Sequence, residues 1–324
     1  MTVTRSRKRL PPWIRGQIPS GPNYTRLKGL MRDQRLATVC EEARCPNVGE
    51  CWGSGTLTVM IMGEVCTRGC RFCSVKSGDP GGVLDADEPR RLAESLAALE
   101  LAYVVFTSVD RDDVPDAGAA HFREAILQVR EHCPDMRVEV LTPDFGGVRE
   151  LVETVATAPP DVFAHNIETV ERLHRRVRDH RAGYEQSLRV LEWAQAAVPG
   201  LITKSSIMVG HGETAAEVEQ TMRDLRASGV DILTLGQYLQ PSRKQLVVEE
   251  FVTPEQFEDY RRLGEEIGFS FVASGAMVRS SYKAAEVFAD SLLEERAAQA
   301  IAAMRGDGAA KPAPGGRDAG PFSV

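Results

Sequence analysis

The residues best suited to chemistry in this chain are cysteines, and six of the seven lie between residues 40 and 75. Their spacing divides them into two unlike triplets: a C-x4-C-x5-C run of Cys40, Cys45 and Cys51, then a C-x3-C-x2-C run of Cys66, Cys70 and Cys73. In a reducing compartment, clustered cysteines are more often metal ligands or catalytic thiols than disulfides. We therefore interpret each triplet as a separate thiolate site.

The second triplet has the spacing of an iron–sulfur site with one ligand missing. Three thiolates can bind three irons of a [4Fe-4S] cluster, whereas the ordinary ferredoxin run adds a fourth cysteine, and none follows Cys73 closely here. An open iron can chelate S-adenosylmethionine, and one electron from the cluster can cleave it to a 5′-deoxyadenosyl radical. A zinc site completed by a distant residue is the alternative, although zinc ribbons usually carry two C-x2-C pairs.

The first triplet is less decisive, because its gaps are wider and it also lacks a fourth ligand. From the spacing alone, a second cluster, a structural zinc and a plain relay cluster all remain open. The seventh cysteine, Cys133, lies in EHCPDMRVEV between a helical and a strand pattern. We expect an inert, partly buried thiol there.

The elements that must position these sites alternate between strand and helix after the cysteine segment. The apolar runs predict strands at residues 56–62, 103–107, 137–141, 162–166, 201–208, 232–237 and 271–273. Helical patterns lie between them at residues 87–100, 119–132, 184–197, 214–229 and 254–268. Repeated strand and helix units predict a parallel sheet in a complete or partial β/α barrel.

In such barrels the active site lies at the C-terminal ends of the strands. Several predicted strands end in polar clusters: TSVDRDD from Thr107, HNIET from His165, VGHGET from Val209 and GQYLQPSRK from Gly236. We expect the chemistry there.

Composition narrows the class of protein. The chain has 324 residues, 43% of them hydrophobic, which is enough for a large core, and its formal net charge of −7 argues against wholesale nucleic-acid binding. No run reaches the length of a membrane span and the N-terminus lacks a secretory signal, so we expect a soluble, intracellular protein. The Gly-, Pro- and Ala-rich residues 305–324 predict a disordered tail.

CEEARCPNVGECW followed by GEVCTRGCRFC, together with TSVDRDD, HNIETV, TKSSIMVGHGET, GQYLQPSRKQL and RSSYKA, resembles lipoyl synthase, a family of radical S-adenosylmethionine enzymes. The similarity begins near Lys8 and extends to about Glu295, which leaves little room for a transit peptide and favours the bacterial cytoplasm. The resemblance implies a partial (β/α)6-type TIM-like barrel over residues 55–275. It adds an N-terminal extension over residues 1–54 and a C-terminal extension over residues 276–304.

The resemblance also implies an activity, a sulfurtransferase acting on a protein-bound octanoyl-lysine. Two sulfur atoms enter at C6 and C8, and two molecules of S-adenosylmethionine are cleaved to methionine and 5′-deoxyadenosine. The carbons are unactivated, so hydrogen-atom abstraction is the sensible route. The sulfur comes from an auxiliary [4Fe-4S] cluster held by Cys40, Cys45, Cys51 and a serine of RSSY, which we assign to Ser281 with Ser280 as the alternative.

Other assignments are weaker. Asn166, Glu168, Lys204 and Ser205 end predicted strands and could bind S-adenosylmethionine, and Asp110 and Arg111 could order the site, but rim caps or salt bridges explain these residues equally well. By analogy we expect as partners octanoylated carrier domains of 2-oxoacid dehydrogenases or the glycine cleavage H protein, a reduced flavodoxin or ferredoxin, and an iron–sulfur carrier for cluster repair. We expect neither nucleic acid nor membrane as a partner.

Two rival functions remain at this stage. One is another radical sulfur inserter, acting on dethiobiotin or a tRNA base, and the other is an electron carrier or zinc-stabilised module. The favoured function requires both cysteine triplets to face each other closely enough for an alkyl chain to lie between them.

Overall fold

The core of the molecule is one eight-stranded sheet in the order β1-β2-β5-β6-β7-β8-β9-β10. The computed structural model describes residues 9–16, 19–33, 37–42, 45, 47–53, 58–99, 101–281, 291–293 and 296. The seven parallel strands are β2 Thr58–Ile61, β5 Tyr103–Ser108, β6 Arg137–Leu141, β7 Val162–Ala164, β8 Ile202–Val209, β9 Ile232–Gln237 and β10 Phe271–Gly275. The short strand β1 Ala37–Thr38 pairs antiparallel with β2 and ends the sheet. All seven predicted strands are present.

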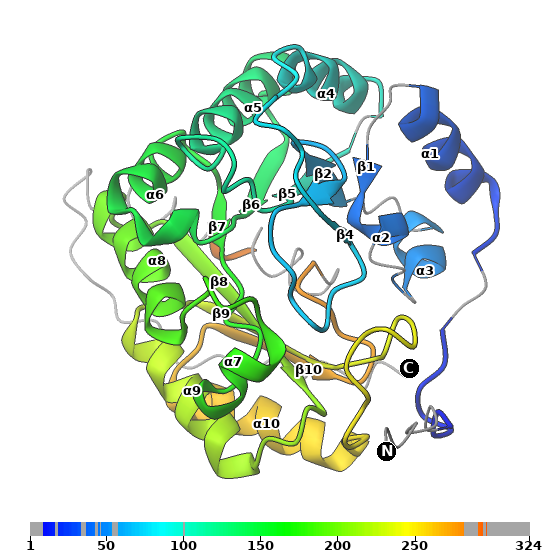
Figure 1. Ribbon diagram of the computed structural model, residues 1–324, viewed down its shortest axis with the longest axis vertical. Helices are drawn as coiled ribbons and strands as arrows, with labels where there is room; N and C mark the ends of the chain where they lie inside the picture. The colour runs from blue at the N-terminus through cyan, green and yellow to red at the C-terminus, as the bar shows by residue number, and fades with distance from the viewer. Residues whose placement is uncertain are drawn as a thin grey trace.

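Helices cover the outer face of this curved sheet, and Figure 1 shows them as an arc around the strands. In chain order they are α4 Glu88–Ala97, α5 Ala119–His132, α6 Arg149–Ala156, α8 Tyr184–Ala197, α9 Ala215–Ala227 and α10 Pro254–Ile267. Six parallel strands are therefore each followed by a helix before β10, and in the part of the chain that the structure describes β1 does not pair with β10. The predicted partial (β/α)6-type barrel is confirmed.

Local sequence explains several helix boundaries. Thr214 caps α9 by accepting a hydrogen bond from the Glu217 backbone N–H, while the Glu217 carboxylate accepts one from the Thr214 backbone N–H, a complete capping box. Thr253 caps α10, and Pro254 occupies its first turn, where a missing N–H costs nothing. The eight-residue helix α6 was not predicted, because so short a stretch shows little periodicity.

The N-terminal segment packs on the barrel core. Helix α1 Pro22–Asp33 meets α3 Val48–Gly53 through Tyr24 and Trp52, whose ring centroids are 5.2 Å apart. Leu27 and Trp52 are fully buried in the same apolar cluster as Phe106 of β5. This packing anchors the first cysteine triplet, which lies in and around α2 Val39–Glu42 and α3, against the barrel.

The start of the strands is closed by other groups. Lys204 of β8 forms a buried ion pair with Glu139 of β6, and residues 292 and 293 pack against Val162, Ile202 and Ile232. The opposite end, where the strands finish, is open to the cavity described below. The tail prediction for residues 305–324 lies outside the described residues. Within the described residues, no helix combines the length and apolar character needed to cross a membrane.

Candidate active site

A cavity of about 980 Å³ lies at the C-terminal ends of the strands. Five triplet cysteines line it: Cys40, Cys45, Cys66, Cys70 and Cys73. The sixth, Cys51, lines a smaller cavity that shares Cys40 and Cys45 with the large one. The segments also touch directly, since the Ser74 hydroxyl donates to the Glu42 carbonyl at 2.9 Å. The structure thus brings both triplets, which are separate in sequence, to one site.

The second triplet lies on a loop closed by two short parallel strands, β3 Val65–Cys66 and β4 Lys76–Ser77. A turn joins Cys70 and Cys73 through a 3.1 Å backbone hydrogen bond. No three His, Cys, Asp or Glu side chains among the described residues are arranged to hold a single metal ion. The cysteines of a four-iron cluster each bind a different iron, so such convergence is not required of them.

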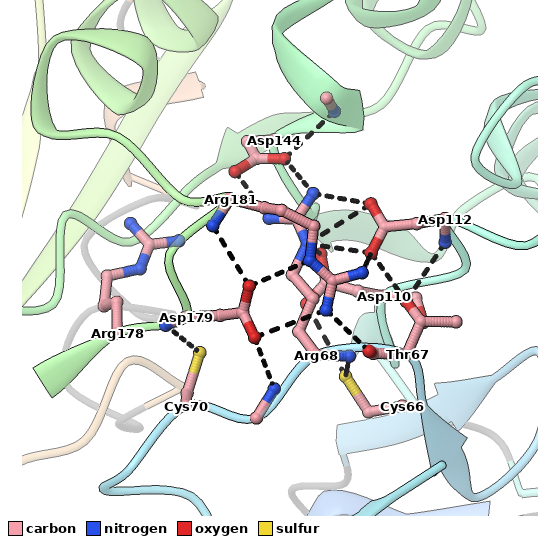
Figure 2. Close-up of polar contacts among 12 residues, drawn as sticks. Cys66, Thr67, Arg68, Cys70, Asp110, Asp112, Asp144, Arg178, Asp179 and Arg181 are labelled. Carbon is pink, nitrogen blue, oxygen red and sulfur yellow. Dashed lines mark hydrogen bonds and ion pairs between the residues drawn. The ribbon is translucent and has the colours of Figure 1, made fainter. Parts of the chain in front are cut away.

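Two backbone amides point at sulfur atoms of this loop. The Arg68 N–H donates to Cys66 Sγ at 3.4 Å, and the Asp179 N–H donates to Cys70 Sγ at 3.3 Å (Figure 2). Hydrogen bonds to cysteine sulfur are one of the means by which proteins adjust the reduction potential of iron–sulfur clusters. The loop therefore has both the donor set and the surroundings that suit an iron–sulfur cluster.

Arg68 fixes the loop through a buried charge network, shown in Figure 2. Its side chain is 3% exposed and forms ion pairs with Asp112 at 2.8 Å, with Asp144 at 2.7 Å and with Asp110 at 3.3 Å. Burial opposes ionisation of Asp144, yet hydrogen bonds from Arg68 hold its pKa below the usual value. Burial raises the pKa of Asp110 to about 6 despite Arg68. The arginine inside the cysteine motif thus joins the loop to the ends of β5 and β6.

Residues 178–181, far along the chain, also hold this loop; we call their contacts with it the Asp179 clamp. The Asp179 carboxylate accepts from the Gly69 backbone at 2.8 Å and from Arg181 Nε at 2.9 Å. Arg181 also donates to the Thr67 carbonyl at 2.7 Å, as Figure 2 shows. Hydrogen bonds from Arg181 and Gly69 keep the pKa of Asp179 well below its ordinary range. We therefore regard 178–181 as part of the site, which the sequence analysis missed.

Burial favours the protonated form of four of the thiols, Cys40, Cys66, Cys70 and Cys73. Burial raises the pKa of Cys66 to about 12 and those of Cys40 and Cys73 to about 11. Burial also raises the pKa of Cys70. Such thiols become thiolates when a metal replaces the proton, as expected of ligands and not of free nucleophiles.

Both serines of RSSY reach the site, but they differ in position. Ser280 and Ser281 line the large cavity, and Ser281 also lines the small cavity with Cys40, Cys45 and Cys51. The turn that carries these serines is tied to the first triplet by Asn47, whose side-chain amide donates to the Met277 carbonyl at 2.6 Å.

Asn166 and Glu168 also line the large cavity. Glu168 has a φ of 70°, a left-handed conformation that is unusual for a residue with a side chain, and such strain is typical of functional sites. Its carboxylate accepts from the Asn166 amide at 3.1 Å, and burial raises its pKa.

Arg178 completes this part of the cavity and was not foreseen from the sequence. Its Nη1 donates to Ser187 Oγ at 2.8 Å, its Nε is buried without a hydrogen-bond partner, and no carboxylate among the described residues lies within ion-pair distance. An unpaired guanidinium in a cavity lining suits an anionic ligand group. The arginine-rich run at residues 172–181 was the available signal.

The structure does not bring Lys204 and Ser205 to the cavity. Lys204 Nζ bonds both Glu139 carboxylate oxygens at 2.7 and 2.9 Å near the start of the strands, and Ser205 Oγ accepts from the Ile167 N–H. Ser206 and Met208, further along β8, line the cavity instead.

Of the two weaker rim assignments, Asp110 lines the cavity and Arg111 does not. Arg111 pairs with Asp113 at 2.8 Å and donates to two backbone carbonyls, so it braces the barrel rim.

Comparison with known proteins agrees with this geometry. Residues 60–225 match the radical SAM superfamily, and residues 2–45 match the N-terminal domain of lipoyl synthase. The chain is 59% identical over 286 residues to the lipoyl synthase of Myxococcus xanthus, covering 88% of this chain and 96% of that protein. It is 55% identical to the lipoyl synthase of Thermus thermophilus, covering 87% of each. This chain belongs to the lipoyl synthase family.

The family extends beyond bacteria and the fold beyond the family. The mitochondrial lipoyl synthase of Culex quinquefasciatus is 54% identical over 91% of this chain and 79% of that protein. Among solved structures, the hydrogenase maturase HydG has a TM-score of 0.54 at 12% identity, covering 84% of this chain and 60% of that one. Streptococcus suis SuiB bound to its precursor peptide has a TM-score of 0.52 at 11% identity, covering 79% and 55%. These two likenesses show the radical SAM fold alone. Family membership makes the chain a radical SAM sulfurtransferase that uses [4Fe-4S] clusters and S-adenosylmethionine.

Proposed function

We propose that this chain makes lipoyl groups by dividing the work between its two cysteine triplets. Cys66, Cys70 and Cys73 would hold the cluster that cleaves S-adenosylmethionine, and Cys40, Cys45 and Cys51 with Ser281 would hold the cluster that donates sulfur. The observation that carries the proposal is the single cavity lined by cysteines of both triplets. When bound, the cluster at Cys66, Cys70 and Cys73 supplies an electron, and the cluster at Cys40, Cys45 and Cys51 supplies sulfide.

The residues around the second triplet, Cys66, Cys70 and Cys73, bind and orient the co-substrate. Arg178, with its unpartnered Nε, suits the carboxylate of S-adenosylmethionine, while Asn166 and Glu168 suit its amino group or ribose hydroxyls. The strained backbone at Glu168 fixes that carboxylate at the cavity wall. We leave Lys204 and Ser205 out of this set, because neither lines the cavity.

The remaining wall of the cavity suits an alkyl chain. Apolar side chains contributed by several strand ends and loops line it, among them Met60, Val109, Leu141, Met208, Val248 and Phe251. An octanoyl chain buried against them would lose its water, and water would be kept from the reacting carbons. This favours an acyl substrate over a nucleobase.

The partners follow from that substrate. We propose octanoylated carrier domains of 2-oxoacid dehydrogenases or the glycine cleavage H protein as the acyl donors. A reduced flavodoxin or ferredoxin would deliver electrons, and an iron–sulfur carrier would rebuild the spent cluster. We propose a bacterial cytoplasmic location; the identity is 59% to the Myxococcus enzyme and 54% to the mitochondrial Culex enzyme.

The test is an anaerobic comparison of two triple variants. Reconstituted wild-type protein should bind about eight irons per chain, and replacing either Cys40, Cys45 and Cys51 or Cys66, Cys70 and Cys73 by alanine should leave about four. With dithionite, S-adenosylmethionine and an octanoyl-lysyl peptide, mass spectrometry should find 5′-deoxyadenosine from the first variant only, and lipoyl product from neither.

Cys133→Ala is the matched control, since this thiol lies outside both triplets and donates to the Ala93 carbonyl at 3.9 Å. It should retain all its iron and full activity. Zinc in place of iron, or 5′-deoxyadenosine from the variant that lacks Cys66, Cys70 and Cys73, would overturn the proposal.

A further inference from the structure

Arg279 lies where the two cavities meet. It lines the large cavity and also the small one, which Cys40, Cys45 and Cys51 enclose together with Asn47, Thr58 and Ser281. Apart from the thiols, Arg279 is the one ionisable side chain among these small-cavity residues. A cation thus faces the first triplet directly.

The charge of this guanidinium is not balanced by a carboxylate within the part of the chain that the structure describes. Its Nη1 donates to the Val278 carbonyl at 2.6 Å and to the Ala276 carbonyl at 3.4 Å, both neutral acceptors. The thiols of Cys40, Cys45 and Cys51 line the same small cavity. Because a buried cation needs a partner, thiolates are the anions that the site provides.

The backbone holds Arg279 in this place from two sides. Gly236, near the end of β9, packs closely against the turn that carries Arg279. A Cβ at position 236 would overlap the Val278 carbonyl and come within 3.3 Å of Arg279 Nη1. The bond from Asn47 to the Met277 carbonyl ties the same turn to α3. The guanidinium position is therefore determined by the end of β9 and by the first triplet together.

We propose that Arg279 is the counter-charge of the auxiliary iron–sulfur centre, a positioning residue that retains the centre until it is used. This inference rests on the proposed assignment of the auxiliary cluster. A fixed positive charge beside an anionic cluster stabilises the cluster against loss of iron and favours its more reduced form. Removing that charge should make the centre more labile and shift its midpoint potential to more negative values.

The experiment uses the full chain in which Cys66, Cys70 and Cys73 are alanine, so that every bound iron reports on the auxiliary site. Three versions are compared after anaerobic reconstitution: Arg279→Met, which removes the charge, Arg279→Lys, which keeps it, and Arg178→Met as a matched control. Arg178 lines the large cavity but not the small one. The readouts are iron and sulfide per chain, the rate of iron release to a chelator, and the midpoint potential by EPR-monitored titration.

Arg279→Met should release iron roughly 10- to 100-fold faster than its parent, the range typical of lost partners around metal ligands. Its midpoint should move to more negative potential, while Arg279→Lys restores most of both properties and Arg178→Met changes neither. Equal release rates and midpoints in parent and Arg279→Met would overturn the inference, as would a Lys variant as labile as the Met variant in protein that circular dichroism shows to be folded. A parent that binds no iron would instead refute the auxiliary site itself.

Discussion

The two cysteine triplets line one cavity, but the protein holds them by different means. The loop of Cys66, Cys70 and Cys73 is fastened by amide hydrogen bonds to sulfur, by Arg68 with three carboxylates, and by the Asp179 clamp. Among the described residues, the first triplet is held by backbone hydrogen bonds of its own short helices and by the bond from Ser74 to Glu42, with Asn47 as the side-chain tie to the RSSY turn. The contrast suggests one site built to keep its cluster through many turnovers and another built to surrender it.

Replacing the proposed serine ligand, Ser281, should change the difference between the two cluster sites the most. Ser281→Cys would replace a hard oxygen by a soft thiolate, which binds iron more firmly. We expect the auxiliary cluster to resist chelators and lipoyl product to fall at least 100-fold, while 5′-deoxyadenosine is still formed. Both products are measured by mass spectrometry in the peptide assay. Ser280→Cys is the control, and equal effects at both positions would mean that the ligand assignment is wrong.

Breaking the charge network should expose how far the second triplet depends on it. Arg68→Met leaves the fully buried Asp144 without its cation and removes one partner from the more exposed Asp110 and Asp112. Removing one partner of a buried pair costs about 3–5 kcal/mol. That is a large part of the stability of an ordinary domain. Denaturant unfolding of the metal-free protein measures it. Arg90→Met, which breaks an exposed pair with Glu94, should leave the midpoint nearly unchanged.

Breaking the Asp179 clamp should disturb the second triplet less than Arg68→Met does. Asp179→Ala removes the acceptor for the Gly69 amide and for Arg181, so the loop loses one of its bonds to residues 178–181. The bonds from the Asp179 N–H to Cys70 and from Arg181 to the Thr67 carbonyl remain. We expect S-adenosylmethionine cleavage to fall about tenfold and the EPR signal of the reduced radical cluster to change. The auxiliary iron content should stay constant. An exposed control, Asp135→Ala, should alter none of these, and loss of auxiliary iron in Asp179→Ala would contradict the division between the two sides.

Sequence patterns predicted the strands and the two triplets because both signals are local. The seven apolar runs each become a buried strand, and the cysteine spacing is compressed into 34 residues of chain. The clamp could not be predicted in this way, since Gly69 and Asp179 are 110 positions apart and Asp179 belongs to no motif. Contacts between residues so far apart in sequence depend on how the curved sheet brings the strand ends together.

The position of Lys204 away from the cavity has a different physical cause. Lys204, Ser206 and Met208 share the inner face of β8 because side chains alternate along a strand. Depth along the strand then decides their roles: Lys204 meets Glu139 near the strand start, and Ser206 and Met208 reach the cavity. The sequence pattern gives the face of a residue, but not its height in the barrel.

His211 is a buried barrel residue whose side chain makes no hydrogen bond among the described residues. It is 2% exposed and stacks on Tyr238 with centroids 4.2 Å apart, and neither ring nitrogen has a hydrogen-bond partner among the described residues. Since a buried unsatisfied polar group costs about 1–3 kcal/mol, His211→Leu should stabilise the protein by about 1 kcal/mol at pH 7. Thermal unfolding measures the change, with His180→Leu, at an exposed position, as the control.

Acid should widen the difference between the wild type and His211→Leu. Burial, together with Arg176, lowers the pKa of His211 to about 4, while Glu249 opposes the shift. Between the ordinary value of 6.5 and about 4, the unfolded chain binds a proton at this residue and the folded chain does not, so falling pH favours unfolding. Other histidines titrate alike in both proteins and cancel. The advantage of His211→Leu should therefore grow by about 1–2 kcal/mol between pH 7 and pH 5. A constant difference would show that His211 finds a proton partner in the folded protein.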